Sequence, residues 1–224
     1  MSPSHTPHRL LVWDLPTRLF HWALVILVIA AWFTAEMSDD LMDYHAPLGY
    51  GVLTLLLFRL AWGFVGSTHS RFSDFIRPPG EALEYLRDMK AGRPSPYLGH
   101  NPLGGWMVAC LLLALLAQAA TGLFASDEIM NEGPFYHLVS SETGSLLTQA
   151  HEMIFNLLTG LVALHVCAVL AYRLIKRENL VLPMITGHKT LQGPGPEPRA
   201  ASLWLAILLL AASGTLVWAL VVLA

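Results

Sequence analysis

The sequence predicts an all-α integral membrane protein, in which a four-helix transmembrane bundle is followed by a fifth, C-terminal transmembrane helix. Hydrophobic residues make up 54% of the 224 residues and charged residues only 13%, whereas soluble domains carry about a quarter charged residues. Five stretches approach or exceed the roughly 20 apolar residues that a membrane-spanning helix needs. Lys and Arg lie on one side of these stretches, as in multi-pass membrane proteins.

The five predicted spans cover residues 19–35, 48–65, 103–125, 146–175 and 203–223. The first follows a short basic leader and resembles a signal peptide, but its aromatic residues and the four later spans favour a retained anchor. Residues 81–89 predict a short amphipathic cytoplasmic helix. We therefore divide the chain into a transmembrane domain (1–180), a cytoplasmic linker (181–201) that includes the sequence GPGPEP, and an additional helix (202–224).

The distribution of basic residues predicts the orientation of the spans. The connections after the first and third spans contain no Lys or Arg, whereas basic residues flank the opposite ends of the first, second and fourth spans. Because cytoplasmic loops carry the excess of Lys and Arg, we expect the N-terminus in the cytoplasm and the C-terminus outside.

The two outer connections are acidic instead. They contain eight carboxylates, at Glu36, Asp39, Asp40, Asp43, Asp127, Glu128, Glu132 and Glu142. One interpretation is a solvated rim. The other is a docking face for a basic partner, because complementary fields accelerate encounter. The sequence leaves both open.

Two histidines lie on the fourth predicted span. His151 and His165 are fourteen residues apart. With about 100° of rotation and about 1.5 Å of rise per residue, they face the same side of the helix at depths roughly 21 Å apart. Because ionisable residues within membrane spans are costly, they are usually functional.

Two further histidines match those depths. His21 opens the first span at the cytoplasmic side, and His45 opens the second at the outer side. We therefore expect an inner pair, His21 with His165, and an outer pair, His45 with His151. Two imidazoles without nearby Cys, Asp or Glu ligands suit bis-histidine haem better than zinc. The alternative for any single histidine is an interhelical hydrogen bond.

The cysteines and small residues agree with non-covalent haem. The two cysteines lie far apart in apolar runs, and there is no CxxCH motif, so covalent c-type haem is not indicated. Gly49 and Gly51 follow His45, and Gly160 lies between His151 and His165. Small residues at these places would let a flat macrocycle approach the helices.

Several motifs resemble the bacterial cytochrome b561 family and the related b-type cytochrome subunits of nickel–iron hydrogenases. They are RLFHW in the first span, HAPLG at His45, FRLAWGF closing the second, GHNPLGG before the third, and the His151/His165 pair. The resemblance covers about residues 12–177. It implies two b-type haems in a four-helix haem-binding bundle of the bacterial inner membrane, with axial ligands His21, His45, His151 and His165. The fifth span departs from the compact members.

Two arginines are candidates for binding haem propionates, because guanidinium pairs with carboxylate in a fork. Arg18 lies three residues before His21, and Arg59 lies near the cytoplasmic end of the second span. For Arg18 the alternative is an ordinary topogenic charge. In the cytoplasmic connections, His69 and His100 could carry protons for a quinone or bind a propionate, or could be plain interface residues.

The resemblance implies electron transfer across the bilayer between the quinone pool and a periplasmic partner, either a cytochrome c or a catalytic redox subunit. One alternative is a stand-alone quinone-linked oxidoreductase of a small periplasmic substrate such as superoxide, although the acidic outer loops would repel that anion. Another is a histidine-based metal or proton transporter, which would need polar groups along its path. The chain contains no flavin or nicotinamide fingerprint, and we assign it no catalytic residue.

Overall fold

The computed structural model describes residues 7–37, 39–93, 97–127, 131–192 and 198–223. Among these residues, five helices are long and apolar enough to cross a membrane. They are α1 (Leu15–Glu36), α2 (His45–Val65), α5 (Pro102–Gly122), α6 (Ser141–Leu174) and α8 (Leu203–Val222). The predicted all-α fold and its transmembrane helices are confirmed.

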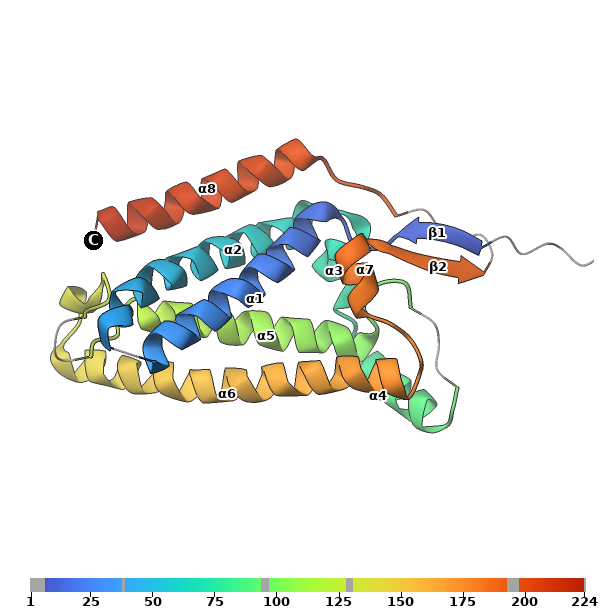
Figure 1. Ribbon diagram of the computed structural model, residues 1–224, viewed down its shortest axis with the longest axis horizontal. Coiled ribbons are helices and arrows are strands. Elements are labelled where there is room, and N and C mark those ends of the chain that lie inside the picture. The colour runs from blue at the N-terminus through green and yellow to red at the C-terminus, as the bar shows by residue number, and fades with distance from the viewer. Residues whose placement is uncertain (1–6, 38, 94–96, 128–130, 193–197, 224) are drawn as a thin grey trace, which may run out of the picture.

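Short elements occupy the ends of these long helices (Figure 1). At the end of the bundle that holds the two acidic connections lie the 3₁₀ turns η1 (Asp39–Tyr44) and η3 (Tyr136–Leu138). At the other end lie η2 (Thr68–Ser70), α3 (Phe72–Phe75), α4 (Pro79–Lys90) and α7 (Val181–Thr186). The α4 helix contains the predicted amphipathic segment 81–89, and it buries Ala82 and Tyr85.

Polar residues fix where the long helices begin. Asp14 caps α1 by accepting a hydrogen bond from the backbone N–H of Thr17 at 2.8 Å. Asn101 caps α5 in the same way, through Gly104 N–H at 2.8 Å. A proline follows each of these caps within the first helical turn, where its missing N–H would have no helical partner. The caps thus set the starting points of α1 and α5.

The long helices pack around α2. It contacts α1, α5 and α8, and α5 in turn packs along α6. The central core includes Leu56, Trp62, Leu112 and Leu158. Figure 1 shows α8 lying along α2, away from α6. The helices that carry His21 and His45 therefore face α5 and α6, while α8 stays at the edge of the bundle.

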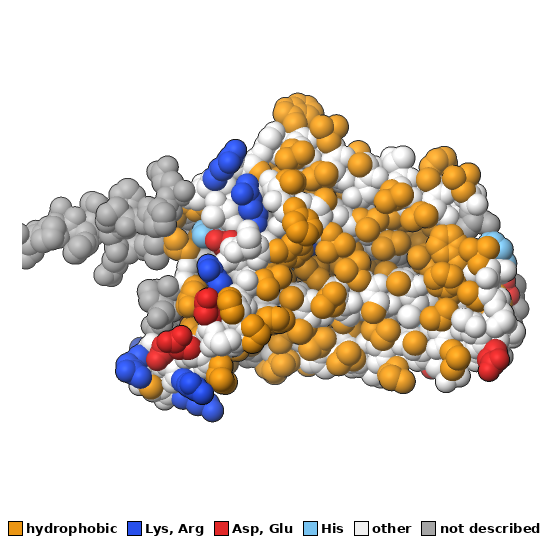
Figure 2. Space-filling model, turned by 180° about the vertical axis from the view of Figure 1, so that it is seen from behind, with side chains coloured by type: hydrophobic (Ala, Val, Ile, Leu, Met, Phe, Trp, Pro, Cys, Tyr) orange, Lys and Arg blue, Asp and Glu red, His pale blue; other side chains and the backbone are white. Residues whose placement is uncertain are grey.

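The surface agrees with a multi-pass membrane protein. Hydrophobic side chains cover a broad band along the molecule, and the visible Lys and Arg side chains gather at the end that holds the short helices and the sheet (Figure 2). Exposed apolar residues in this band include Ile26 and Leu157, on α1 and α6. Lipid would cover such residues. Of the acidic outer residues, Glu128 lies outside the described residues.

Two strands join the beginning of the chain to the segment after α6. β1 (Pro7–Leu11) pairs antiparallel with β2 (His188–Gln192). Before β2, α7 ends at Gly187, whose φ of 86° favours glycine. The carbonyl of Gly187 accepts hydrogen bonds from the N–H groups of Val12 and Trp13, at 2.7 and 3.0 Å. The segment expected as a linker thus carries secondary structure before its Pro/Gly-rich part, of which residues 193–197 lie outside the described residues.

Candidate haem-binding site

The α6 helix presents one continuous face to the rest of the bundle. His151, Leu158, His165 and Tyr172 follow one another at seven-residue intervals. Leu158 is buried, and the other three side chains are partly buried. A seven-residue spacing is close to two helical turns, so these side chains lie in one row. The two histidines therefore face the bundle interior at two depths.

The outer pair of histidines is close together. The ring centres of His45 and His151 are 6.2 Å apart, and their planes are 82° apart. Two metal–nitrogen bonds of about 2 Å, plus roughly 1 Å from each nitrogen to its ring centre, would place two axial imidazoles about 6 Å apart. The observed separation therefore has room for a shared metal ion.

Hydrogen bonds fix the tautomer of both outer rings. His45 Nδ1 lies 2.9 Å from the carbonyl oxygen of Ala31, and His151 Nδ1 lies 2.9 Å from that of Gln118. A carbonyl only accepts, so each Nδ1–H donates and each Nε2 keeps its lone pair. This is the arrangement that metal-binding histidines commonly adopt. The side-chain amide of Gln118 lies 3.0 Å from Nε2 of His151, a contact that sequence reasoning missed.

The inner pair lies at the opposite end of the bundle. His21 and His165 are near enough to interact electrostatically. His21 contacts Trp22 edge-on at 5.0 Å between ring centres, and its buried Nδ1 has no hydrogen-bond partner among the described residues. The structure thus brings together the histidines that the sequence paired by depth. Their role as ligands stays a prediction.

Arg59 is the most deeply buried charged residue near this inner pair. It is 3% exposed, and its guanidinium lies over the rings of Phe72 and Phe75, at 5.2 and 5.6 Å. Its Nη1 is buried and finds no hydrogen-bond partner within the described part of the chain. A buried cation without a bonded counter-charge is costly. The site therefore favours an anionic group beside Arg59.

Arg18 and His100 complete the surroundings of the inner pair. Arg18 donates to the carbonyl oxygen of Ile185 in α7, while its Nε is buried and unpartnered within the described residues. His100 lies between the rings of Trp13 and Phe75, at 4.6 and 4.9 Å. Burial, followed by repulsion from Arg59, lowers the pKa of His100 to about 3.

Asp14 ties the start of α1 to the end of α2. Besides capping α1, its carboxylate accepts hydrogen bonds from Trp62 Nε1 at 3.1 Å and from Ser70 Oγ at 3.2 Å. Asp14 also acts electrostatically on Arg59. Sequence reasoning did not single out Asp14. Its position two residues before Pro16, at the start of an apolar helix, is the signal that could have found it.

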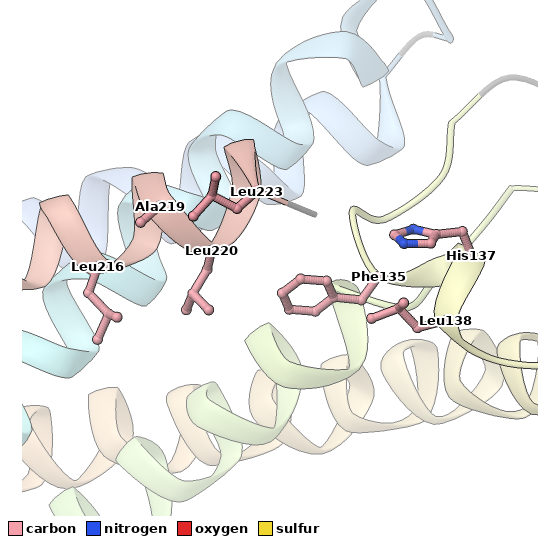
Figure 3. Close-up of a pocket in the computed structure, with 7 residues that line it drawn as sticks. All are labelled: Phe135, His137, Leu138, Leu216, Ala219, Leu220 and Leu223. Carbon is pink, nitrogen blue, oxygen red and sulfur yellow. The ribbon is translucent and has the colours of Figure 1, made fainter.

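These residues fit a b-type haem at each end. Each outer imidazole keeps an Nε2 lone pair, which in His151 accepts from the Gln118 amide. The inner end offers donors without a partner among the described residues, which carboxylates such as propionates would satisfy. A separate apolar cavity of about 290 Å³ lies between α8 and η3 and is lined by Phe135, His137, Leu138, Leu216, Ala219, Leu220 and Leu223 (Figure 3). None of the paired histidines lines it.

The chain is similar to known proteins over most of its length. It is 25% identical over 220 residues to the probable Ni/Fe-hydrogenase B-type cytochrome subunit of Azotobacter chroococcum mcd 1, covering 83% of this chain and 90% of the relative. It is 24% identical over 214 residues to the protein of the same name from Cupriavidus necator, covering 81% and 87%. No solved structure matches.

Most of the chain matches one known protein family. Residues 12–187 match the family described as prokaryotic cytochrome b561. This range contains both histidine pairs, Arg18, Arg59 and the helices that hold them, whereas β2 and α8 lie beyond it. Because the match spans well over half of the chain, this multi-pass membrane protein belongs to the prokaryotic cytochrome b561 family of b-type cytochromes.

Proposed function

We propose that this chain is a di-haem cytochrome that transfers electrons across the bacterial inner membrane, between the quinone pool and a periplasmic redox partner. The observation that carries the proposal is that His151 and His165, at two depths on α6, each lie near a second histidine. A rise of about 1.5 Å per residue separates the two depths by roughly 21 Å. Sites at both depths would give electrons a stepwise route across the bilayer.

Each pair has a defined part in this proposal. His45 and His151 would hold the outer haem, and their Nδ1–H bonds to backbone carbonyls orient the rings. His21 and His165 would hold the inner haem. When bound, haem supplies a reversible one-electron couple. Between the two depths, Leu158 is buried in the apolar core, which excludes water from the middle of the bundle.

Arg18 and Arg59 would bind the propionates of the inner haem. Both have buried, unpartnered guanidinium nitrogens within the described residues. A propionate carboxylate accepts charge-assisted hydrogen bonds from such groups. It would also offset the cost of burying Arg59, whose guanidinium lies over the rings of Phe72 and Phe75. These arginines therefore position the cofactor from the cytoplasmic end.

The relatives suggest the kind of partner. They are named as B-type cytochrome subunits of Ni/Fe hydrogenase, so we infer that a catalytic hydrogenase subunit docks at the outer end. A periplasmic cytochrome c is the other candidate. The acidic connections would face such a partner if the N-terminus is cytoplasmic and the C-terminus periplasmic, and the basic side chains at the opposite end support this orientation (Figure 2).

Haem content tests the proposal directly. The purified protein should give a ratio of two haems per chain in a pyridine haemochrome assay against protein mass, because each histidine pair holds one. His137→Ala is the control, since His137 is exposed and belongs to neither pair. A ratio of one or zero in the fully folded protein would overturn the proposal.

A further inference from the structure

A histidine–aspartate pair lies at the cytoplasmic end of the bundle, outside the two proposed ligand pairs. His69 in η2 and Asp74 in α3 are joined by a bond of 2.9 Å between Nδ1 and the carboxylate. The His69 side chain is 12% exposed and the Asp74 side chain 28%. The carboxylate is therefore accessible to water, and the imidazole lies between the carboxylate and the interior of the protein.

The far side of the His69 ring faces the interior without a partner. Its Nε2 is buried and has no hydrogen-bond partner among the described residues. Gly99 lies against the ring, since a Cβ at this position would approach Nδ1 of His69 to 3.2 Å. Asp74 and Gly99 thus hold the ring in one orientation, with one nitrogen toward the surface and the other inside.

Titratable and charged groups from several elements lie near His100, which itself lies near His69. His100, directly before the α5 cap, interacts electrostatically with His69, with Arg59 from α2, with His165 from α6 and with Lys189 from β2. Burial holds the pKa of His100 at about 3, so His100 stays neutral at physiological pH. Of His69 and His100, His69 is the one whose imidazole is bonded to a carboxylate.

We propose that Asp74 and His69 take up a proton from the cytoplasm when the inner site gains an electron. This inference rests on the proposed function, because it requires a haem at His21 and His165. One electron arrives from quinol or from a chemical reductant, and one proton from cytoplasmic water converts the His69 imidazole to imidazolium beside Asp74. Oxidation reverses both transfers. The added proton offsets the added negative charge in a region of low dielectric, where an uncompensated charge is costly.

Potentiometric titration of the full-length protein in detergent tests the inference. We expect the midpoint potential of the inner component to fall as the pH rises from about 5.5 to 8.5. The limiting slope is about 59 mV for each tenfold change in proton concentration, for one proton per electron. The inner component is identified as the one that His21→Ala removes. His69→Gln and Asp74→Asn should flatten the slope.

His137→Gln is the matched control, because it makes the same change in an exposed histidine at the other end of the molecule, and it should leave the slope unchanged. Haem content, measured on the same samples, reports separately on the proposed function. A wild-type inner potential that does not change with pH would overturn the inference without any variant. A slope that persists in both His69→Gln and Asp74→Asn, with two haems bound, would also overturn it.

Discussion

At the scale of single residues, the backbone hydrogen bonds of the outer histidines carry the most information. A membrane histidine with a structural role usually bridges two helices through its side chain. His45 and His151 each form such an interhelical bond, by donating one ring N–H to a carbonyl oxygen of a neighbouring helix, and metal-binding histidines commonly make the same bond. The Nε2 of each ring keeps its lone pair, and in His151 this lone pair accepts a hydrogen bond from the Gln118 amide, which a bound cation would replace.

Substitution of single histidines should reveal which residues share a haem. His45→Ala and His151→Ala should each lose the same haem, and His21→Ala and His165→Ala should each lose the other, because an iron with one protein ligand is held far more weakly. Redox titration should leave one component with matching potential within each pair of variants. If His21→Ala matched His45→Ala, the pairing by depth would be wrong. His137→Ala should retain both components.

At the scale of elements, the contact between α5 and α6 positions the outer site. Gly122 ends α5, and a Cβ added there would come within 2.9 Å of Cε1 and 3.2 Å of Nδ1 of His151. The absence of a side chain at Gly122 therefore leaves the room that His151 occupies. By contrast, a Cβ at Gly160 on α6 would meet nothing within 4 Å among the described residues.

Gly122→Ala should weaken the outer haem selectively. The added methyl group must displace the His151 ring, and changes in groups that orient a metal ligand typically reduce affinity by about 10- to 100-fold. Titration of haem into the apoprotein would measure the loss, with the inner haem as an internal reference. Gly80→Ala on α4 is the control and should bind both haems normally, because a Cβ added there would meet nothing within 4 Å among the described residues. Equal affinities in the two variants would contradict the proposed role of Gly122.

The sequence predicts the long helices and the outer histidine pair, but not the short strands or the bond between His69 and Asp74. The long spans follow from apolar length alone, and the pairing of His45 with His151 follows from helical rise and phase. The sequence did not indicate β1 and β2, because each has five residues and finds its partner far along the chain. It placed His69 and His100 in the cytoplasmic region, but not the bond to Asp74, which depends on how η2 and α3 turn.

At the scale of the whole molecule, charge is divided between the two ends. Glu132, in the connection after α5, and Glu142, in the first turn of α6, are exposed, whereas Lys and Arg residues gather at the opposite end (Figure 2). A field of this kind attracts a basic partner to the outer end. Its main effect is on the rate of association, since charges at the rim of an interface guide encounter more than they hold a complex.

Electron exchange with a basic soluble cytochrome c should therefore slow as salt rises, because screening acts over about 8 Å at physiological ionic strength. The double change Glu132→Gln with Glu142→Gln should lower the low-salt rate several-fold and flatten its salt dependence in stopped-flow traces. Glu81→Gln with Glu84→Gln on α4 removes the same charge from the other end and should have no such effect. An electron-exchange rate that does not change with salt concentration would indicate that these acidic residues form only a solvated rim.

The pairing of β1 with β2 also sets an order of events during biogenesis. β1 leaves the ribosome first, but its partner follows only after α6 and α7 have been made. At about 5–20 residues per second, the interval from Leu11 to His188 is roughly 10 to 35 seconds. The strand pair and the contacts of Gly187 with Val12 and Trp13 therefore form late. Until β2 has been made, the β1–β2 pair and the Gly187 contacts are absent from this end of the bundle. A haem could therefore enter the proposed inner site before these contacts form.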